Sequence, residues 1–212
     1  RAYVPDTLWP AVRERVVAMM ADIRMGDVAD FRNFVGAVID KKGFDKIAEY
    51  IQTARKAKGV ELVAGGTADD AVGYFIEPTL LRAEDPRYRT MCEEIFGPVL
   101  TLHVYPAARW EETLALVDGT SPYALTGAVF AQDRRVLTQA TDALRNAAGN
   151  FYLNDKPTGA VVGQQPFGGA RASGTNDKAG SILNLMRWIS PRSIKETFVP
   201  PTNYRYPFMD AE

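Results

Sequence analysis

Several features are scarce in this sequence of 212 residues, and each scarcity argues against a class of protein. A single cysteine, Cys92, leaves no partner for an internal disulfide and indicates a reducing compartment. Because His103 is the single histidine, we expect no metal site built from histidine and cysteine. No apolar run approaches the roughly 18 residues that span a bilayer, so we expect no membrane span. The formal net charge of −1 gives no reason to expect nucleic acid as a partner.

The remaining composition is typical of a globular protein, with 46% hydrophobic and 24% charged residues. The sequence opens at Arg1 rather than at a methionine, and the strand-like run Ala2-Tyr3-Val4 follows at once. We therefore expect a piece of a larger protein whose fold begins upstream.

Strand and helix patterns alternate along most of the chain. Apolar runs predict strands over 3–5, 60–64, 74–81, 99–105, 125–130 and 151–153. Helical spacing predicts helices over 8–25, 40–58, 110–117 and 134–146. This order predicts an α/β fold with an open, largely parallel sheet and flanking helices. The run 193–199 alternates like an edge strand, and we expect it to pair with a sheet of another domain or subunit.

The stretch from 149 to 180 begins as a strand and then becomes a long irregular run. It holds seven glycines and the prolines Pro157 and Pro166. Long irregular segments in compact domains are usually functional or are linkers. A flexible surface linker has little use for apolar residues such as Val161 and Phe167, so we favour a ligand-clamping loop over a linker.

Neither the single cysteine nor the single histidine is a good candidate for a catalytic residue. Glu93 and Glu94 beside Cys92 would oppose formation of a thiolate, and His103 lies in an alternating strand without an evident catalytic partner. Cys92 and His103 are therefore expected to be structural.

The run Glu94 to Pro98 is a more specific indication of a site. A carboxylate can accept two hydrogen bonds from a ribose diol, and an aromatic ring at Phe96 could pack on a flat heterocycle. By spacing alone, an ordinary turn before a strand remains the alternative.

Three motifs together resemble the aldehyde dehydrogenase superfamily. They are EEIFGPV at 93–99, GNFYLND at 149–155 and QPFGGARASGTND at 165–177. The longer match NDKPTGAVVGQQPFGG and the tail NYRYPFM resemble one branch, the Δ1-pyrroline-5-carboxylate dehydrogenases. The resemblance implies an incomplete catalytic domain of this family over 1–183, its C-terminal portion, and an oligomerisation or interdomain strand and tail over 184–212.

The resemblance also implies a reaction. Members of this branch oxidise L-glutamate γ-semialdehyde to L-glutamate with NAD, in the breakdown of proline. It further implies a homo-oligomer formed through the C-terminal strand, in the cytoplasm or in the mitochondrial matrix. No targeting segment is visible in this stretch.

By motif match, the resemblance implies roles for five residues. Glu94 would bind the nicotinamide ribose, and Phe96 would pack at the nicotinamide end. Gly159 and Ala160 would offer main-chain N–H groups to the substrate α-carboxylate, although some members have a serine hydroxyl at the position of Ala160. Phe167 would form a wall around the aliphatic stem of the substrate. The nucleophilic cysteine, the general-base glutamate and the dinucleotide fold are expected upstream of Arg1, so this segment would hold no catalytic residue and would be inactive alone.

Two alternatives remain open at this stage. The missing nucleophile and the aromatic tail also fit a non-catalytic interaction or oligomerisation module. The parent could equally be a bifunctional proline-oxidising polypeptide that carries the same dehydrogenase domain.

Overall fold

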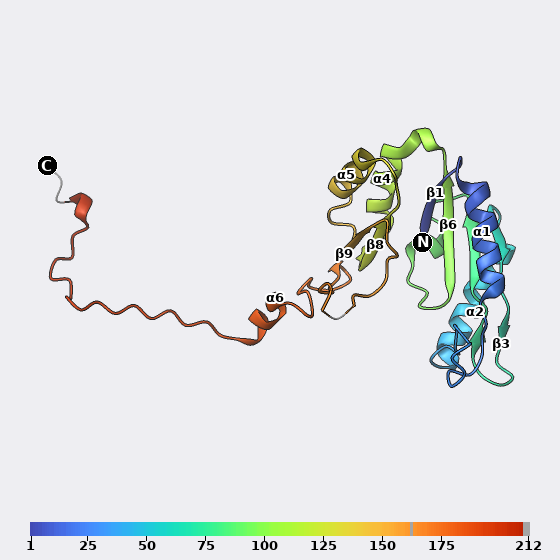
Figure 1. The fold of residues 1–212 in the computed structure, drawn as a ribbon, viewed down its shortest axis with the longest axis horizontal. Coiled ribbons are helices and arrows are strands. Elements are labelled where there is room, and N and C mark those ends of the chain that lie inside the picture. The colour runs from blue at the N-terminus through green and yellow to red at the C-terminus, as the bar shows by residue number, and fades with distance from the viewer. Residues whose placement is uncertain (162, 210–212) are drawn as a thin grey trace.

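The computed structural model describes residues 1–161 and 163–209, and its largest element is a mixed four-stranded sheet (Figure 1). The strand order is β1 (Ala2–Pro5), β6 (Val99–Tyr105), β5 (Thr79–Ala83) and β2 (Val60–Ala64). Strands β1 and β5 run parallel to β6, whereas β2 is antiparallel to β5. The expected α/β fold with a largely parallel sheet is confirmed, with an antiparallel strand at one edge.

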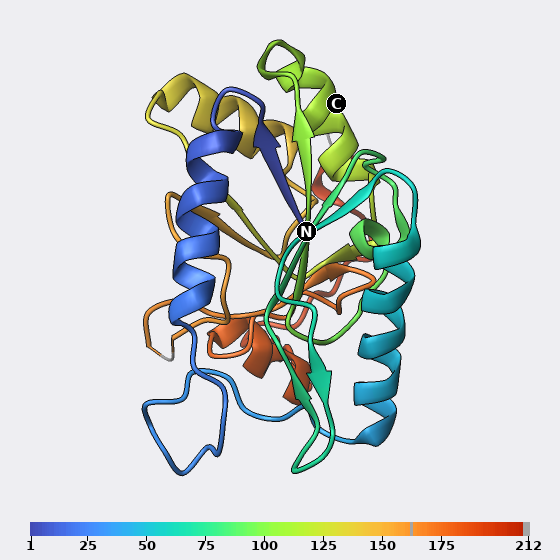
Figure 2. The same cartoon turned by 90° about the vertical axis from the view of Figure 1, so that its right-hand side faces the viewer.

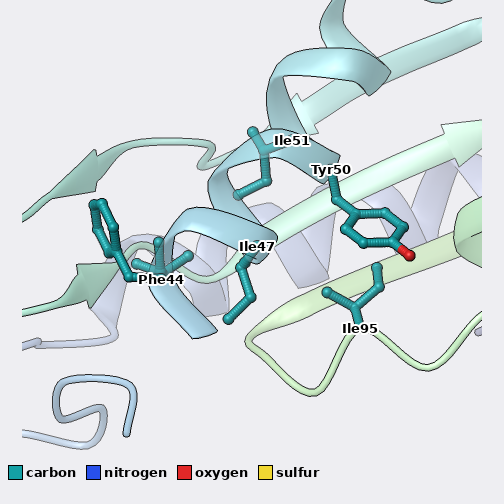
Figure 3. Packing of buried hydrophobic residues seen from close by; sticks show 6 residues of the cluster. Phe44, Ile47, Tyr50, Ile51 and Ile95 are labelled. Carbon is teal, nitrogen blue, oxygen red and sulfur yellow. The ribbon is translucent and has the colours of Figure 1, made fainter. Parts of the chain in front are cut away.

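Two helices cover the sheet. Helix α1 (Trp9–Asp22) and helix α2 (Lys41–Lys56) lie on opposite sides of it (Figure 2). Asp40 caps α2 by accepting a hydrogen bond from the Gly43 N–H (2.7 Å). Helix α2 buries one face, made of Phe44, Ile47, Tyr50, Ile51 and Ala54. Most of this face packs with Ile76 and Ile95 in the main hydrophobic cluster (Figure 3).

A second layer stands beside the main sheet (Figure 1). In it, β8 (Thr126–Val129) runs parallel to β9 (Asn150–Leu153), and α4 (Trp110–Gly119) and α5 (Arg134–Ala143) pack together. Its core is formed by Leu114, Ala140 and Leu144, against which Val129 and Phe151 are packed. Each layer therefore has a hydrophobic core of its own.

Short elements fill the connections, and they correct one prediction. They are β3 (Ala68–Asp69), β4 (Phe75–Ile76), α3 (Arg89–Cys92), β7 (Tyr123–Ala124), β10 (Ala170–Arg171) and α6 (Ile182–Leu185), with 3₁₀ turns at 107–109, 186–188 and 207–209. The single strand expected over 74–81 is wrong, because the chain there forms β4 and β5 separately. They are separated by Glu77 and Pro78, and a proline cannot donate to a sheet ladder.

Beyond the 3₁₀ turn Met186–Trp188, the chain leaves the body as an extended tail (Figure 1). The side chains of Ile194, Phe198 and Val199 are 78%, 91% and 82% exposed. Within the described residues no strand pairs with this tail, so the expected pairing of 193–199 with another sheet stays a prediction. The expected boundary between 183 and 184 falls inside α6 and is likewise a prediction, and residues 210–212 of the expected tail lie outside the described residues.

The side chain of Leu81 is fully buried in β5. The loss of stability on its substitution should therefore depend on how much side-chain volume is removed. In the full-length protein, Leu81→Ala should lower the free energy of unfolding by about 2–5 kcal/mol, because it removes buried methyl groups and leaves a cavity. Leu81→Met is the matched control, since it conserves volume and should cost less than about 1.5 kcal/mol. Chemical denaturation measures both. Equal, small effects of the two substitutions would contradict this description of the core.

Candidate functional site

The predicted cofactor residues lie in the connection between β5 and β6. After the single turn of α3, residues 93–98 lead directly into β6, and the Thr79 N–H donates to the Pro98 carbonyl (2.8 Å). Thr79 also opposes Val99 in the ladder, so the segment lies at the edge of the sheet where the parallel strands β5 and β6 begin.

Within residues 93–98 the side chain of Ile95 is buried, whereas Glu94 and Phe96 on either side of it are exposed. Ile95 is 7% exposed and belongs to the main hydrophobic cluster, whereas Glu94 and Phe96 are exposed, Phe96 to 84%. Figure 3 shows Ile95 directed toward Tyr50 and Ile47 of α2. Phe96 has φ +64°, a left-handed conformation that non-glycine residues seldom adopt and that occurs often at functional sites. No side chain or N–H of the described residues hydrogen-bonds the Glu94 carboxylate, which is therefore available to a ligand.

A polar cluster that the sequence did not indicate lies next to Glu94. The Tyr50 hydroxyl donates to a carboxylate oxygen of Glu93, and this hydrogen bond lowers the pKa of Glu93. The Arg89 guanidinium covers the Tyr50 ring, with 4.1 Å from its carbon to the ring centroid, and reaches the same Glu93 oxygen at 3.4 Å. Tyr50 and Glu93 are 43 positions apart, so no local pattern could have revealed this pair.

The predicted substrate residues lie on the irregular loop that leaves the carboxyl end of β9. Two side chains tie the base of this loop to the second layer. The amide of Asn150, which is 9% exposed, donates to the Pro166 carbonyl (2.9 Å) and accepts from the Gly168 N–H (3.0 Å). The Lys178 ammonium donates to the carbonyls of Gly149 and Gly168, and burial lowers its pKa. A loop closed in this way at its base differs from a free linker.

The tip of the loop presents unused main-chain donors. The Tyr152 hydroxyl donates to the Thr158 carbonyl (3.0 Å) and fixes the chain just before Gly159. Among the described residues, no acceptor pairs with the N–H of Gly159 or of Ala160. Phe167 is half-buried and is held in a two-residue bridge with Ala179, with hydrogen bonds of 2.9 and 2.8 Å. Main-chain N–H groups without an acceptor suit an anionic ligand at the tip.

The structure thus places the five predicted site residues in two groups. Glu94 and Phe96 belong to the main sheet, whereas Gly159, Ala160 and Phe167 belong to the loop of the second layer. No hydrogen bond, ion pair or ring contact among residues 1–161 and 163–209 joins the two groups. Their roles as ligand contacts stay predictions.

The remaining polar candidates have structural partners. The thiol of Cys92 lies 3.4 Å from the Arg87 carbonyl oxygen, and His103 Nδ1 lies 3.1 Å from the Ala83 carbonyl oxygen. The His103 ring also packs edge-on against Tyr3. Within the part of the chain that the structure describes, no group of three histidine, cysteine or acidic side chains is arranged to hold a metal ion. No helix there combines the length and the apolar character needed to cross a membrane.

Comparisons with known proteins agree on one family. The model of the aldehyde dehydrogenase family matches residues 1–194. The chain is 57% identical over 209 residues to the mitochondrial Delta-1-pyrroline-5-carboxylate dehydrogenase of Dictyostelium discoideum, covering 99% of this chain and 38% of that protein. It is 53% identical over 210 residues to the human mitochondrial protein of the same name, covering 99% of this chain and 37% of the relative. The chain therefore spans a little over a third of the length of these curated relatives.

Solved structures give the same result. The Delta-pyrroline-5-carboxylate dehydrogenase of Mycobacterium tuberculosis bound with NAD superposes with a TM-score of 0.85 at 52% identity, over 100% of this chain and 38% of that one. The 1-pyrroline-5-carboxylate dehydrogenase from Thermus with bound NAD superposes with a TM-score of 0.74 at 35% identity, over 87% of this chain and 34% of that one.

Two glycines of the stretch 149–180 should respond differently to a larger side chain. A Cβ on Gly149 would lie 1.9 Å from the Gly168 carbonyl oxygen, whereas a Cβ on Gly159 would meet nothing within 4 Å. Gly149→Ala should therefore lower the free energy of unfolding by about 1–3 kcal/mol through overpacking, and Gly159→Ala should leave it within about 0.5 kcal/mol. Chemical denaturation of the full-length protein, with hydrogen exchange of the loop amides, measures both. A well-tolerated Gly149→Ala would show that the loop is not packed against β9 as described.

Proposed function

Because this chain belongs to the aldehyde dehydrogenase family, we propose that it is the C-terminal part of an NAD-dependent enzyme that oxidises L-glutamate γ-semialdehyde to L-glutamate. The observation that carries the proposal is the pair of unpaired N–H groups at Gly159 and Ala160, presented by a loop that is tied down at its base. High identity to relatives named for Δ1-pyrroline-5-carboxylate supports the choice of substrate.

At the substrate end, the loop recognises the α-carboxylate of the amino-aldehyde. The N–H groups of Gly159 and Ala160 donate to it, and an alanine at position 160 adds no hydroxyl to these main-chain contacts. Phe167 packs along the methylene groups and excludes water from them, as apolar walls do in small-molecule sites. Together these contacts distinguish an amino-aldehyde from an aldehyde that lacks the carboxylate.

At the cofactor end, Glu94 accepts hydrogen bonds from the two hydroxyl groups of the nicotinamide ribose, as acidic residues do in dinucleotide sites. Its exposed carboxylate, without a partner among the described residues, fits this role. Phe96 packs at the nicotinamide end. When bound, NAD supplies the acceptor for the hydride that leaves the aldehyde carbon.

The nucleophile is proposed to be a cysteine upstream of Arg1. Strand β1 lies beside β6 and parallel to it, with Ala2 opposite Leu102, so both strands begin at the same edge of the sheet. The segment that carries Glu94 lies at this edge as well. Residues that precede Arg1 would therefore enter the site close to the ribose-binding carboxylate, which suits attack on the aldehyde next to the nicotinamide.

We also propose that the tail mediates assembly into a homo-oligomer, through residues 193–199 in the unit 184–212. The exposed apolar side chains of the tail support this proposal. For the location we propose the mitochondrial matrix for a eukaryotic parent, supported by the word mitochondrial in the names of two relatives, and the cytoplasm for a bacterial parent.

A non-catalytic interaction module is the second candidate, favoured by the same exposed tail. The coding sequence upstream of Arg1 decides between them. A dinucleotide-binding domain followed by a cysteine supports the enzyme, whereas a start codon close to Arg1 supports the module. An additional proline-oxidising domain in the same reading frame would identify a bifunctional parent.

A bulky side chain at position 159 tests the anchor role. In the full-length enzyme, Gly159→Val should raise KM for L-glutamate γ-semialdehyde about tenfold or more, because the branched side chain displaces the carboxylate from its N–H donors. A simple aliphatic aldehyde, which has no carboxylate to anchor, serves as the internal control and should change little. Steady-state kinetics with both substrates measures the difference, and equal losses for the two would count against the anchor.

Removing the charge at position 94 tests the cofactor role. Glu94→Gln keeps the size of the side chain but provides one acceptor oxygen instead of two. We expect the full-length variant to bind NADH about tenfold more weakly, because hydrogen bonds to a charged group are worth more than neutral ones. Fluorescence titration with NADH measures the affinity, and an unchanged dissociation constant would contradict the assignment.

A further inference from the structure

We propose that Lys46 and Tyr50 of α2 are positioning residues for the cofactor end of the site, because they hold the main chain that carries Glu94 and Phe96. The inference rests on the proposed ribose-binding role of Glu94. Neither residue touches the ligand in this proposal. They act through the segment 93–97, which makes a charged, a polar and an apolar contact with α2.

The charged contact is at Lys46. Its ammonium donates to the main-chain carbonyl of Glu94 at 2.9 Å, across 48 positions of sequence. The same nitrogen lies 5.9 Å from the centroid of the Tyr50 ring. Lys46 therefore fixes the backbone of Glu94 itself and leaves the carboxylate of that residue free.

The polar contact is at Tyr50, one helical turn further along α2. Tyr50 is only 7% exposed, and its hydroxyl reaches the carboxylate of Glu93. Arg89 is stacked on the Tyr50 ring and directed to the same carboxylate. Glu93 is thus bound from α2 and from α3 together, which fixes the residue that immediately precedes Glu94.

The apolar contact limits how far the segment can move. Ile95 is buried with Ile47 and Tyr50, and a Cβ on Gly97 would lie 2.4 Å from Cδ1 of Ile47, whose side chain is fully buried. Gly97 therefore permits the main chain to lie directly on α2. Between these fixed points, Phe96 takes its left-handed φ of +64°, and such strain persists only where the surroundings enforce it.

The side chains of Glu94 and Phe96 are exposed, whereas three neighbouring positions contact α2. Positions 93, 95 and 97 contact α2 through a side chain or a close approach of the main chain, whereas the side chains at 94 and 96 face outward. A helix that holds Glu93, the main chain of Glu94 and Ile95 restricts where the Glu94 carboxylate and the Phe96 ring can lie. A small displacement of the Glu94 carboxylate or of the Phe96 ring would weaken its contact with the cofactor, since binding and hydride transfer depend on geometry.

Two conservative substitutions in the full-length enzyme test this inference. Lys46→Met keeps the aliphatic stem and removes the donor to Glu94, and Tyr50→Phe keeps the ring under Arg89 and removes the hydroxyl. Lys42→Met is the matched control, because Lys42 is an exposed lysine on the same helix whose ammonium has no hydrogen bond or ion pair with the described residues. Each variant is titrated with NADH and assayed for KM of the aldehyde, and its unfolding midpoint is measured.

We expect Lys46→Met and Tyr50→Phe to weaken NADH binding about three- to tenfold, because a Glu94 carboxylate that is held less well in place loses about one hydrogen bond to the cofactor. KM for the aldehyde and the unfolding midpoint should stay close to those of the parent, and Lys42→Met should behave like the parent. Unchanged NADH affinity in both variants overturns the inference. So does a general loss of stability with parallel changes in both substrates, which would indicate a merely structural role.

The Glu94→Gln titration separates this inference from the proposed function. If Glu94→Gln weakens NADH binding and the two α2 variants do not, the positioning role fails while the ribose contact stands. If Glu94→Gln has no effect, the ribose contact itself is refuted.

Discussion

The buried face of α2 is the constraint on which the rest of the main sheet depends. Ile47 and Ile51 lie within the cluster that closes one side of the sheet, and the same face meets the segment that leads into β6. Burial of such side chains is worth about 1.5–3 kcal/mol each. The helix is therefore held firmly by apolar contact, and its polar side chains can act on the neighbouring loop from a fixed base.

In the second layer, hydrogen bonds rather than apolar contacts hold the segment that carries the site residues. A long loop rich in glycine has much conformational entropy to lose, and the buried amide of Asn150 and the ammonium of Lys178 satisfy its main-chain groups at the base. These hydrogen bonds hold the later part of the loop, at Pro166, Gly168 and Lys178, against the start of β9, and the donors at Gly159 and Ala160 remain free. In both site groups, hydrogen bonds hold the main chain near the residues that are proposed to contact the ligand.

The sequence predicted the elements whose pattern is local. Strands β2 and β6 have the bounds that their apolar runs indicated, and α2 begins within one residue of the start that the helical pattern indicated. The family motifs pointed to Glu94 and to the loop around Gly159. Contacts between distant segments could not be predicted, since nothing near Tyr50 indicates a partner at Glu93. The one-turn helix α3 was also missed, because four residues are too few to show a helical period.

The extended tail has a consequence for how the protein would be purified and stored. Its apolar side chains gain nothing from the body of their own chain, because they lie away from it (Figure 1). If residues 193–199 pair with a second copy, part of the folding free energy is supplied by association and follows mass action. Dilution would then lower the melting temperature, and the dilute protein would expose the apolar segment 193–199 to non-specific association with other proteins.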